Sequence, residues 1–221
     1  MRAEISGPPG PRVESHFARR DLLSVIELIP ATYLAPLDLL AIFGCAAPLQ
    51  VDLGCGDGSF LCKLAQACPK RNFLGIDKMV GRVEKTCRKA TALENVRVLN
   101  VEISYAVRFL LPPESVETFY LFFPDPWPKR RHHRRRLVTT EFLDSIPRAL
   151  ATEGTFYIAT DDLDYFEQIQ RIANSTEKLE CIMHSSFGED AGLPQTKFER
   201  RFREQGLPIY RLTLRKISPV T

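Results

Sequence analysis

Short apolar runs alternate along the chain with stretches in which apolar residues recur at helical spacing. Apolar runs bounded by turn residues are typical of buried strands, and the stretches between them are typical of helices that cover a sheet. The runs predict strands at residues 48–53, 72–77, 96–102, 116–123, 154–161, 178–184 and 208–216. The helical spacing predicts helices at residues 59–68, 139–150 and 164–174, and one that follows residue 77 and ends near residue 92.

Strands that alternate with helices indicate βαβ units and a mostly parallel sheet with helices on both faces. The length of 221 residues suits one large domain, or one domain with extensions. We therefore expect an α/β fold with a partly mobile N-terminal arm at residues 1–33, where Gly and Pro are frequent, and a single domain at residues 34–221.

The remaining bulk features favour a cytoplasmic protein. Polar residues and prolines interrupt the most apolar region, residues 22–49, which argues against a transmembrane helix, and the N-terminus lacks the apolar core of a signal peptide. Six cysteines occur without a C-x-x-C pair or a His cluster, so we expect reduced, buried thiols and no metal site.

Carboxylates stand at the ends of five predicted strands. In a parallel sheet, ligands bind beyond the carboxyl ends of the strands, and these ends share one rim. One such acid means little, since turns favour Asp, but five in register predict a binding site at this rim. The five are Asp52, Asp77, Glu102, Asp125 and Asp161.

A glycine loop joins the first of these strands to the helix that follows. Gly54, Gly56 and Gly58 let the backbone pass close to a ligand without a side-chain clash. The dinucleotide pattern G-x-G-x-x-G would need a glycine at position 59, where this chain has Ser59. The loop instead fits G-x-G-x-G, which is usual in enzymes that use S-adenosylmethionine.

The rim acids suit that cofactor. Asp52 is placed for the amino end of its methionine, and Asp77 for its two ribose hydroxyls. Glu102, or the backbone of Ile103, would meet the adenine. A plain structural role is the alternative for two of them. For Asp77 this is a helix N-cap, and for Glu102 the alternative is stronger because its segment is less distinctive.

The most distinctive segment of the chain is residues 122–136. Prolines on both sides fix the backbone around Asp125 and Trp127, and a stiff acid beside an aromatic suits a flat ligand such as a base. The next eight residues, 129–136, hold six Lys or Arg and two His. Without those six, 24 basic residues face 27 acidic ones, so the net charge of +3 depends on this run. Such a run is an electrostatic footprint for phosphate.

These motifs carry a resemblance to a known family. With DLGCGDG, GIDKM, ATD and TKFE, the segment PDPWPKRRHHRRRL resembles the bacterial tRNA (guanine-N7)-methyltransferases, from about Leu49 to Leu212. The resemblance implies a Rossmann-like class I fold that depends on S-adenosyl-L-methionine. It implies methyl transfer to N7 of the guanine at position 46, in the tRNA variable loop. It implies tRNA as the partner. From the sequence itself we expect no membrane association and no obligate protein partner.

The resemblance also implies roles for individual residues. Asp125 is implied to be catalytic as well as cofactor-binding. Asp52 replaces the more usual Glu, and Glu102 a usual Asp or Asn, which keeps an acceptor but changes its reach. The resemblance places Asp52, Asp77, Glu102 and Asp125 at cofactor-binding positions. Together with the glycine loop and the residues beside the rim acids, the expected cofactor-binding set also includes Gly54, Gly56, Gly58, Lys78 and Ile103. The implied substrate-binding residues are Lys129, Asp161, Thr196, Lys197, Phe198 and Glu199. From charge alone, we expect Arg130, Arg131, Arg134, Arg135 and Arg136 to contact tRNA phosphates.

Several alternatives stay open at this point. Guanine N7 already has a lone pair, so we expect Asp125 to orient the base rather than to remove a proton. Trp127 stacks on a base or buttresses its loop. Spacing alone makes residues 196–199 an exposed turn before a basic helix. The competing functions are a non-catalytic RNA-binding protein, an NAD-dependent oxidoreductase, which Ser59 opposes, and a methyltransferase acting on amino groups.

Overall fold

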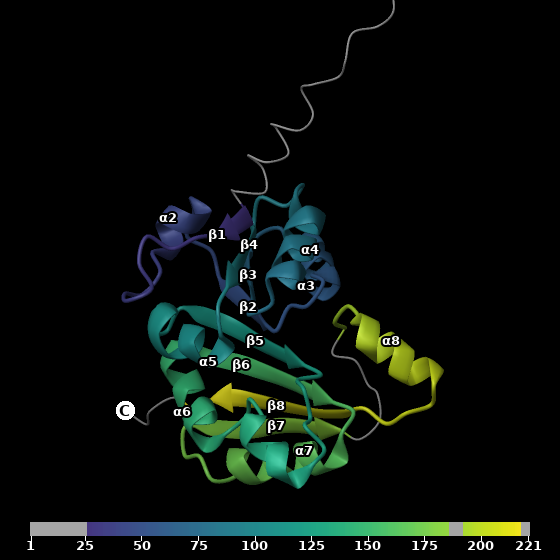
Figure 1. The fold of residues 1–221 in the computed structure, drawn as a ribbon. Coiled ribbons are helices and arrows are strands. Elements are labelled where there is room, and N and C mark those ends of the chain that lie inside the picture. The colour runs from purple at the N-terminus through teal and green to yellow at the C-terminus, as the bar shows by residue number, and fades with distance from the viewer. Residues whose placement is uncertain (1–25, 186–191, 218–221) are drawn as a thin grey trace, which may run out of the picture.

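A single sheet organises the protein. A computed structural model describes residues 26–185 and 192–217, so the predictions for residues 1–25 lie outside the described residues. In the described part, eight strands form one sheet in the order β1-β4-β3-β2-β5-β6-β8-β7 (Figure 1). The strands are β1 (Glu27–Leu28), β2 (Leu49–Leu53), β3 (Asn72–Asp77), β4 (Val96–Asn100), β5 (Val116–Phe122), β6 (Leu150–Thr160), β7 (Leu179–Ser185) and β8 (Tyr210–Lys216).

The sheet is mostly parallel, as the alternation of strands and helices predicts. Parallel pairing runs from β1 through β4, β3, β2 and β5 to β6, whereas β8 is antiparallel to both β6 and β7. The order reverses at β2, since β3 lies on one side of it and β5 on the other. Ligands bind at such a switch point, beyond the carboxyl ends of the strands.

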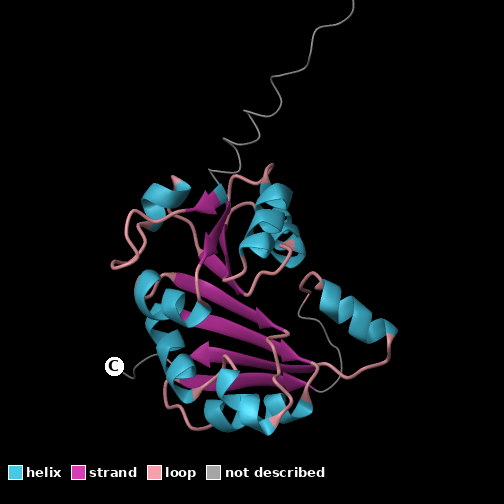
Figure 2. Cartoon of the chain, viewed as in Figure 1, coloured by secondary structure: helices cyan, strands magenta, loops and turns pink. Residues whose placement is uncertain are grey.

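Helices cover both faces of the sheet, which confirms the predicted α/β class (Figure 2). Successive strand residues point to opposite faces. Val51 and Phe119 belong to the core under the helices after β4, β5 and β6, whereas Phe73 and Tyr120 belong to the core under α3 and α4. The helices are α2 (Leu39–Phe43), α3 (Ser59–Ala67), α4 (Val80–Ala90), α5 (Ile103–Tyr105), the π-helix η1 (Ala106–Leu110), the 3-10 helix η2 (Arg130–Arg135), α6 (Thr140–Ala149), α7 (Leu163–Ala173) and α8 (Lys197–Glu204).

Three elements differ from the sequence expectation. The strand β1 is short, yet it pairs with β4, so the sheet includes residues on the N-terminal side of the expected boundary at residue 34. The helical segment 103–110 was not predicted because it is brief and partly π-helical. The strand β6 begins at Leu150, four residues earlier than predicted, and helix α6 runs through Pro147 to Ala149.

Two expectations about special residue types can be compared with the structure. All six cysteines are free; Cys55, Cys62 and Cys87 are buried, but Cys45 and Cys181 are exposed, so the expectation of burial was wrong for these two. Among the described residues, no cluster of three His, Cys, Asp or Glu side chains could hold a metal ion. No helix in the same part of the chain has the length and apolar character needed to span a membrane.

Candidate active site

The five rim acids stand at the carboxyl ends of five parallel strands. Asp52 is the fourth residue of β2, Asp77 ends β3, and Glu102, Asp125 and Asp161 follow β4, β5 and β6. Four of them line two adjoining cavities. Asp161 is absent from the lining of both, so the structure separates this expected substrate-binding residue from the other four.

The two cavities meet at the end of β5. The first, which we call the α5 cavity, has a volume of about 590 Å³ and is lined by Asp77, Lys78, Glu102 and Ile103 among others. The second, the α8 cavity, has a volume of about 790 Å³ and is lined by the glycine loop, Asp52, α4 and α8. Both cavities share Gly54, Arg82, Phe122, Phe123 and Asp125. Asp125 therefore lies at their junction.

Asp77 is buried and shapes the turn around the first cavity. Its carboxylate accepts hydrogen bonds from the backbone N–H of Gly56 (3.1 Å) and of Met79 (2.9 Å). Arg82 lies 3.6 Å from the same carboxylate. Asp77 thus ties the glycine loop to the start of α4, although Met79 is the residue at the N-cap position. Each carboxylate oxygen has a second acceptor site, so the side chain can still receive a hydroxyl.

Asp52 is buried with only 4 % of its surface exposed, and it makes no hydrogen bond with any described residue through its side chain. Burial, together with the charge of Asp77, raises the pKa of Asp52 from 3.8 to about 7. A buried carboxylate is costly unless a partner charge compensates it. The α8 cavity beside Asp52 therefore favours a cationic ligand group, such as an ammonium.

The glycine loop supplies close backbone approach at two of its three glycines. Gly54 and Gly56 have φ angles of +84° and +59° and line the α8 cavity. Gly58 has a different task, because a Cβ there would lie 2.5 Å from Cγ2 of Thr86 on α4. Gly54 and Gly56 remain candidates for contact with a ligand, whereas Gly58 permits the close packing of the loop on α4.

Glu102 is exposed, and its carboxylate accepts a hydrogen bond of 2.8 Å from the backbone N–H of Tyr105, so it caps α5. The plain structural role therefore operates here. The same side chain still lines the α5 cavity beside Ile103, whose side chain reaches within 3.7 Å of a Cβ built on Gly54.

The loop that carries Asp125 is held by Arg136, the last residue of the basic run. Its guanidinium donates to the carbonyl oxygen of Pro126 (2.7 Å), and to the side chains of Gln168 (2.7 Å) and Asp164 (2.6 Å) on α7. It also lies 4.8 Å from the ring centre of Tyr165. Arg136 is only 3 % exposed, so its placement does not fit the expected phosphate contact. It anchors the Asp125 loop to α7 instead.

Asp125 itself is exposed and makes no hydrogen bond with the described part of the chain. Phe123 and Trp127, on either side of it, have φ angles of +53° and +46°, an unusual conformation for such side chains. The ring of Trp127 is contacted by the guanidinium of Arg135 at 4.9 Å and by the edge of His132 at 5.9 Å. These contacts support the buttressing role of Trp127.

The other Lys and Arg residues of the basic run project from the surface. Lys129 precedes η2, and Arg130, Arg131, Arg134 and Arg135 lie on it; all five are exposed. Lys129, Arg130, Arg131 and Arg134 line neither cavity. They flank the site and do not form its walls.

The basic helix α8 is present as predicted, but the TKFE segment is not an exposed turn before it, because Thr196 is its N-cap and residues 197–199 form its first turn. Thr196 is buried and caps α8 by accepting a hydrogen bond from the Glu199 N–H at 3.0 Å. Lys197 forms an ion pair with Asp57 of the glycine loop. Phe198 is 54 % exposed and packs with Phe123 and Phe202 at ring-centre distances of about 6 Å. Thr196, Lys197 and Phe198 all line the α8 cavity.

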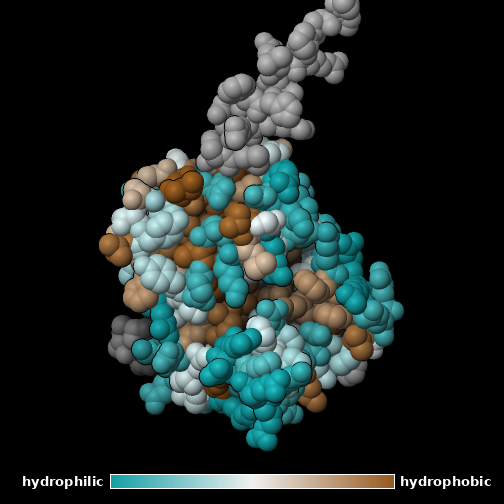
Figure 3. Space-filling model, in the orientation of Figure 1, coloured by the Kyte–Doolittle hydropathy of each residue, from teal (hydrophilic) through white to brown (hydrophobic). Residues whose placement is uncertain are grey.

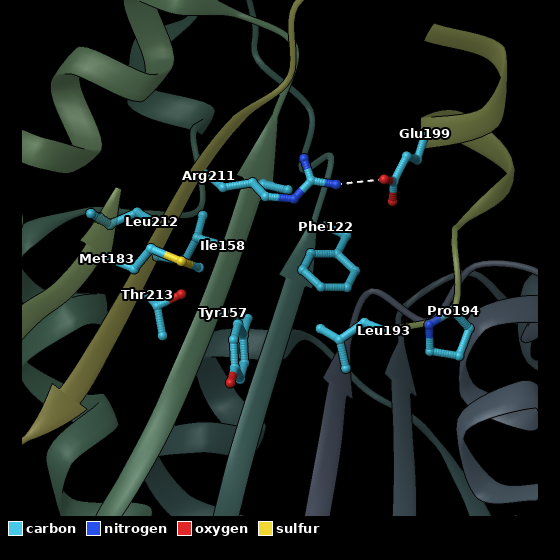
Figure 4. A pocket seen from close by; sticks show the side chains of 11 residues that line it. Phe122, Tyr157, Ile158, Met183, Leu193, Pro194, Glu199, Arg211, Leu212 and Thr213 are labelled. Atoms are coloured by element: carbon cyan, nitrogen blue, oxygen red, sulfur yellow. Dashed lines mark hydrogen bonds and ion pairs between the residues drawn. The ribbon is translucent and has the colours of Figure 1, made fainter. Parts of the chain in front are cut away.

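Glu199 turns away from that cavity. Its carboxylate accepts hydrogen bonds from Arg211 on β8 (2.5 Å) and from Arg203 on α8 (3.0 Å). Figure 4 shows Glu199 reaching from α8 across to Arg211, beside a small cavity of about 20 Å³ that Phe122 and Pro194 also line. Glu199 is thus placed to anchor α8 to the sheet, and not to meet a ligand in the α8 cavity.

Asp57 is the main site residue that sequence reasoning missed. It receives Lys197 from α8 and, at 2.6 Å, Lys89 from α4. Partial burial alone would raise its pKa, but the bonds from both lysines hold the pKa of Asp57 well below its usual range. The available signal in the sequence was the position of Asp57 inside the glycine loop. Its neighbours there have no side chains, so they do not prevent it from pairing with distant lysines.

Comparison with known proteins gives one consistent family. Residues 46–212 match a family model described as "Putative methyltransferase". A tRNA (guanine-N(7)-)-methyltransferase of Halorhodospira halophila is 38 % identical over 183 residues, which cover 81 % of this chain and 79 % of that one. Its counterpart from Leifsonia xyli subsp. xyli is 38 % identical over 190 residues, covering 82 % of each chain.

Solved structures share the fold at lower identity. The 16S rRNA methyltransferase KamB superposes with a TM-score of 0.61 at 21 % identity, covering 83 % of this chain and 95 % of that one. A geranyl diphosphate methyltransferase in complex with GPP and sinefungin superposes with a TM-score of 0.55 at 12 % identity, covering 90 % and 77 %. These similarities establish the methyltransferase fold.

Proposed function

The chain belongs to the tRNA (guanine-N(7)-)-methyltransferase family, and on that premise we propose that it transfers a methyl group from S-adenosyl-L-methionine to N7 of a guanine in tRNA. One observation carries the proposal: Asp125 lies where a cavity suited to an adenosine meets a larger cavity that reaches α8. Within tRNA, we propose the guanine at position 46 of the variable loop.

The residues present fit the cofactor. The uncompensated acid Asp52 suits the ammonium of its methionine moiety, and the backbone at Gly54 and Gly56 allows close approach. Asp77 has acceptor capacity left for ribose hydroxyls, and the α5 cavity offers Lys78, Glu102 and Ile103 to the adenine. When bound, S-adenosyl-L-methionine supplies a methyl group on a positively charged sulfur.

Asp125 then acts on the substrate. Its carboxylate is exposed at the junction and has no partner among the described residues, so it can accept hydrogen bonds from the N1–H and amino group of guanine. Two such bonds would fix the orientation of N7 and would stabilise the positive charge that the ring gains on methylation. No proton needs to leave N7, so Asp125 is proposed as an orienting acceptor and not as a general base.

Residues on α8 and after β5 complete the proposed substrate site. Phe198 offers an exposed ring beside Phe123 on which a purine can stack, and Thr196 and Lys197 line the same cavity. We retain Lys129 and Asp161 as outer substrate contacts. Four exposed arginines remain proposed phosphate contacts: Arg130, Arg131, Arg134 and Arg135. We propose that Arg136 and Glu199 have positioning roles: Arg136 anchors the Asp125 loop, and Glu199 anchors α8.

The proposed cellular compartment follows from the substrate. We propose that the protein acts in the cytoplasm, where tRNA is modified, and that it needs no protein partner. The purified chain should therefore methylate tRNA without any added protein.

A transfer assay tests the proposal. Purified protein, S-adenosyl-L-methionine labelled on its methyl group and an unmodified tRNA transcript should give labelled tRNA, whereas a transcript with adenine at position 46 should not. Asp125→Ala should bring transfer to background while the melting temperature stays within about 2 °C of wild type, because Asp125 makes no bond within the described chain. Near-wild-type turnover of Asp125→Ala would contradict the assigned role. A non-catalytic RNA-binding protein would give no labelled tRNA at all.

A further inference from the structure

The α8 cavity carries more positive charge than a methyl donor can use. Six cationic side chains line it, against the three carboxylates of Asp52, Asp57 and Asp125. The proposed cofactor has a single carboxylate of its own, so it cannot use all the cations that the described residues of the protein leave unpaired. The six are Arg82, Lys85, Arg88, Lys89, Lys197 and Arg201.

Four of these cations form one face of α4. That helix buries Val83, Cys87 and two other residues against the sheet, which leaves its basic residues exposed on the opposite side. Arg82, Lys85 and Lys89 follow the i, i+3, i+7 spacing of one helix face. From residue 82 to residue 89 the helix rises by about 10 Å. That is the rise of about three stacked nucleotides in one strand.

Helix α8 continues this positive surface from the other side of the cavity. Lys197 and Arg201 are one helical turn apart and both line the cavity. Asp57 joins the two helices, since it binds Lys89 of α4 and Lys197 of α8 at the same time. In Figure 3, hydrophilic residues cover the surface over α4 and continue onto the outer part of α8.

Not all of this charge is used within the protein. Arg82 pairs with Asp77, and Arg88 lies 3.8 Å from Glu84 on its own helix. Lys85 and Arg201 form no ion pair with any residue that the structure describes. Such cations, next to the cavity that holds Asp125, are available for phosphate.

We propose that α4 and α8 form a second phosphate-binding track, which grips the RNA backbone next to the target nucleotide on the side opposite the run at residues 129–135. The inference rests on the proposed function, because it takes the anion to be the sugar–phosphate backbone of tRNA. The target base then enters between two basic surfaces. One is the run at residues 129–135, beyond the α5 cavity, and the other is the α4–α8 track around the α8 cavity.

The test uses charge reversal at the two cations without ion-pair partners. Lys85→Glu/Arg201→Glu should weaken tRNA binding by about tenfold or more at physiological salt and should lower the slope of log affinity against log salt by about 2. The affinity for S-adenosyl-L-methionine, measured by calorimetry, should stay within about twofold of wild type, which also reports that the variant is folded. Lys85→Gln/Arg201→Gln is the milder variant if the double reversal impairs folding.

A matched control has the same change in charge elsewhere. Lys63 on α3 and Lys178 before β7 are exposed and line neither cavity, so Lys63→Glu/Lys178→Glu should bind tRNA with the wild-type salt slope. If the Lys85/Arg201 variant and the control bind tRNA equally well, the track is refuted while the proposed function stands. If tRNA binding depends on Lys85 and Arg201 but wild-type protein transfers no methyl group, the track is supported and the proposed function fails.

Discussion

Asp52 offers a direct test of how the site is charged. The side chain is buried, and its pKa lies near 7 instead of 3.8 because burial and the charge of Asp77 oppose its ionisation. Asp52→Asn keeps the shape of the side chain and removes the charge. We expect this variant to be more stable than wild type above neutral pH, although it loses a proposed cofactor contact.

The magnitude follows from the shift of the pKa. The difference is about 3 pH units, and each unit corresponds to about 1.36 kcal/mol. The ionised carboxylate therefore lowers the free energy of unfolding at pH 8 by up to about 4 kcal/mol. The amide of Asn must itself be desolvated, and this reduces the gain in the free energy of unfolding by about 1–3 kcal/mol. We expect a net gain of about 1–3 kcal/mol at pH 8.

The pH dependence fixes the sign of the effect. Because the pKa is raised in the folded protein, the folded state holds a proton on Asp52 that the unfolded chain has already released between pH 3.8 and about 7. The contribution of this group to stability is therefore complete below pH 3.8 and is lost as the pH rises to about 7. The difference in unfolding free energy between Asp52→Asn and wild type should grow over this interval and then level off.

Urea denaturation at several pH values measures this difference, and calorimetry measures the cofactor. The ligand ammonium should compensate the wild-type carboxylate, so Asp52→Asn should lose about 1.5–3 kcal/mol of binding free energy at pH 8, roughly ten- to hundredfold in affinity. An Asn variant that is less stable than wild type at pH 8, with a difference that does not change with pH, would refute the reasoning.

Three further variants and one control test the scaffold. Arg136→Ala should lower the free energy of unfolding by about 2–4 kcal/mol, because it removes three hydrogen bonds and the packing on Tyr165. If stability is unchanged and tRNA binding depends less on salt concentration, Arg136 is a phosphate contact after all. Gly58→Ala should cost about 1–3 kcal/mol, since its φ is +73° and the new Cβ would collide with Thr86. Gly81→Ala is the matched control: open space surrounds this helical position, so thermal denaturation should show unchanged or slightly higher stability. Glu199→Gln should raise KM for tRNA more than it lowers kcat, because a weakened bond to Arg211 shifts α8 without touching Asp125; a loss in kcat alone would contradict the anchoring role.

The sequence was sufficient to predict what local patterns determine. Apolar runs bounded by turns predict the central strands within a few residues, and residues at or just beyond the carboxyl end of each strand then lie at the rim by geometry. This is why Asp52, Asp77, Glu102 and Asp125 were identified as neighbours before the structure placed them around the same two cavities.

Contacts between distant segments account for what was not predicted. Nothing near Arg136 in the sequence distinguishes it from Arg134 or Arg135, and only the approach of α7 gives it buried acceptors. In the same way, the sequence suits Glu199 to a ligand, and only the fold brings Arg211 of β8 beside it. The pairing of Asp57 with two lysines likewise depends on how α4 and α8 meet the glycine loop.

The identity of the methylated atom tests the central claim most directly. An unmodified tRNA transcript is incubated with the purified protein and S-adenosyl-L-methionine, digested to nucleosides and to oligonucleotides, and analysed by mass spectrometry against nucleoside standards. The account predicts 7-methylguanosine as the sole new nucleoside, located at position 46 of the variable loop. A methyl group on an exocyclic amino group of guanine or adenine, or no methylation of tRNA, would contradict it.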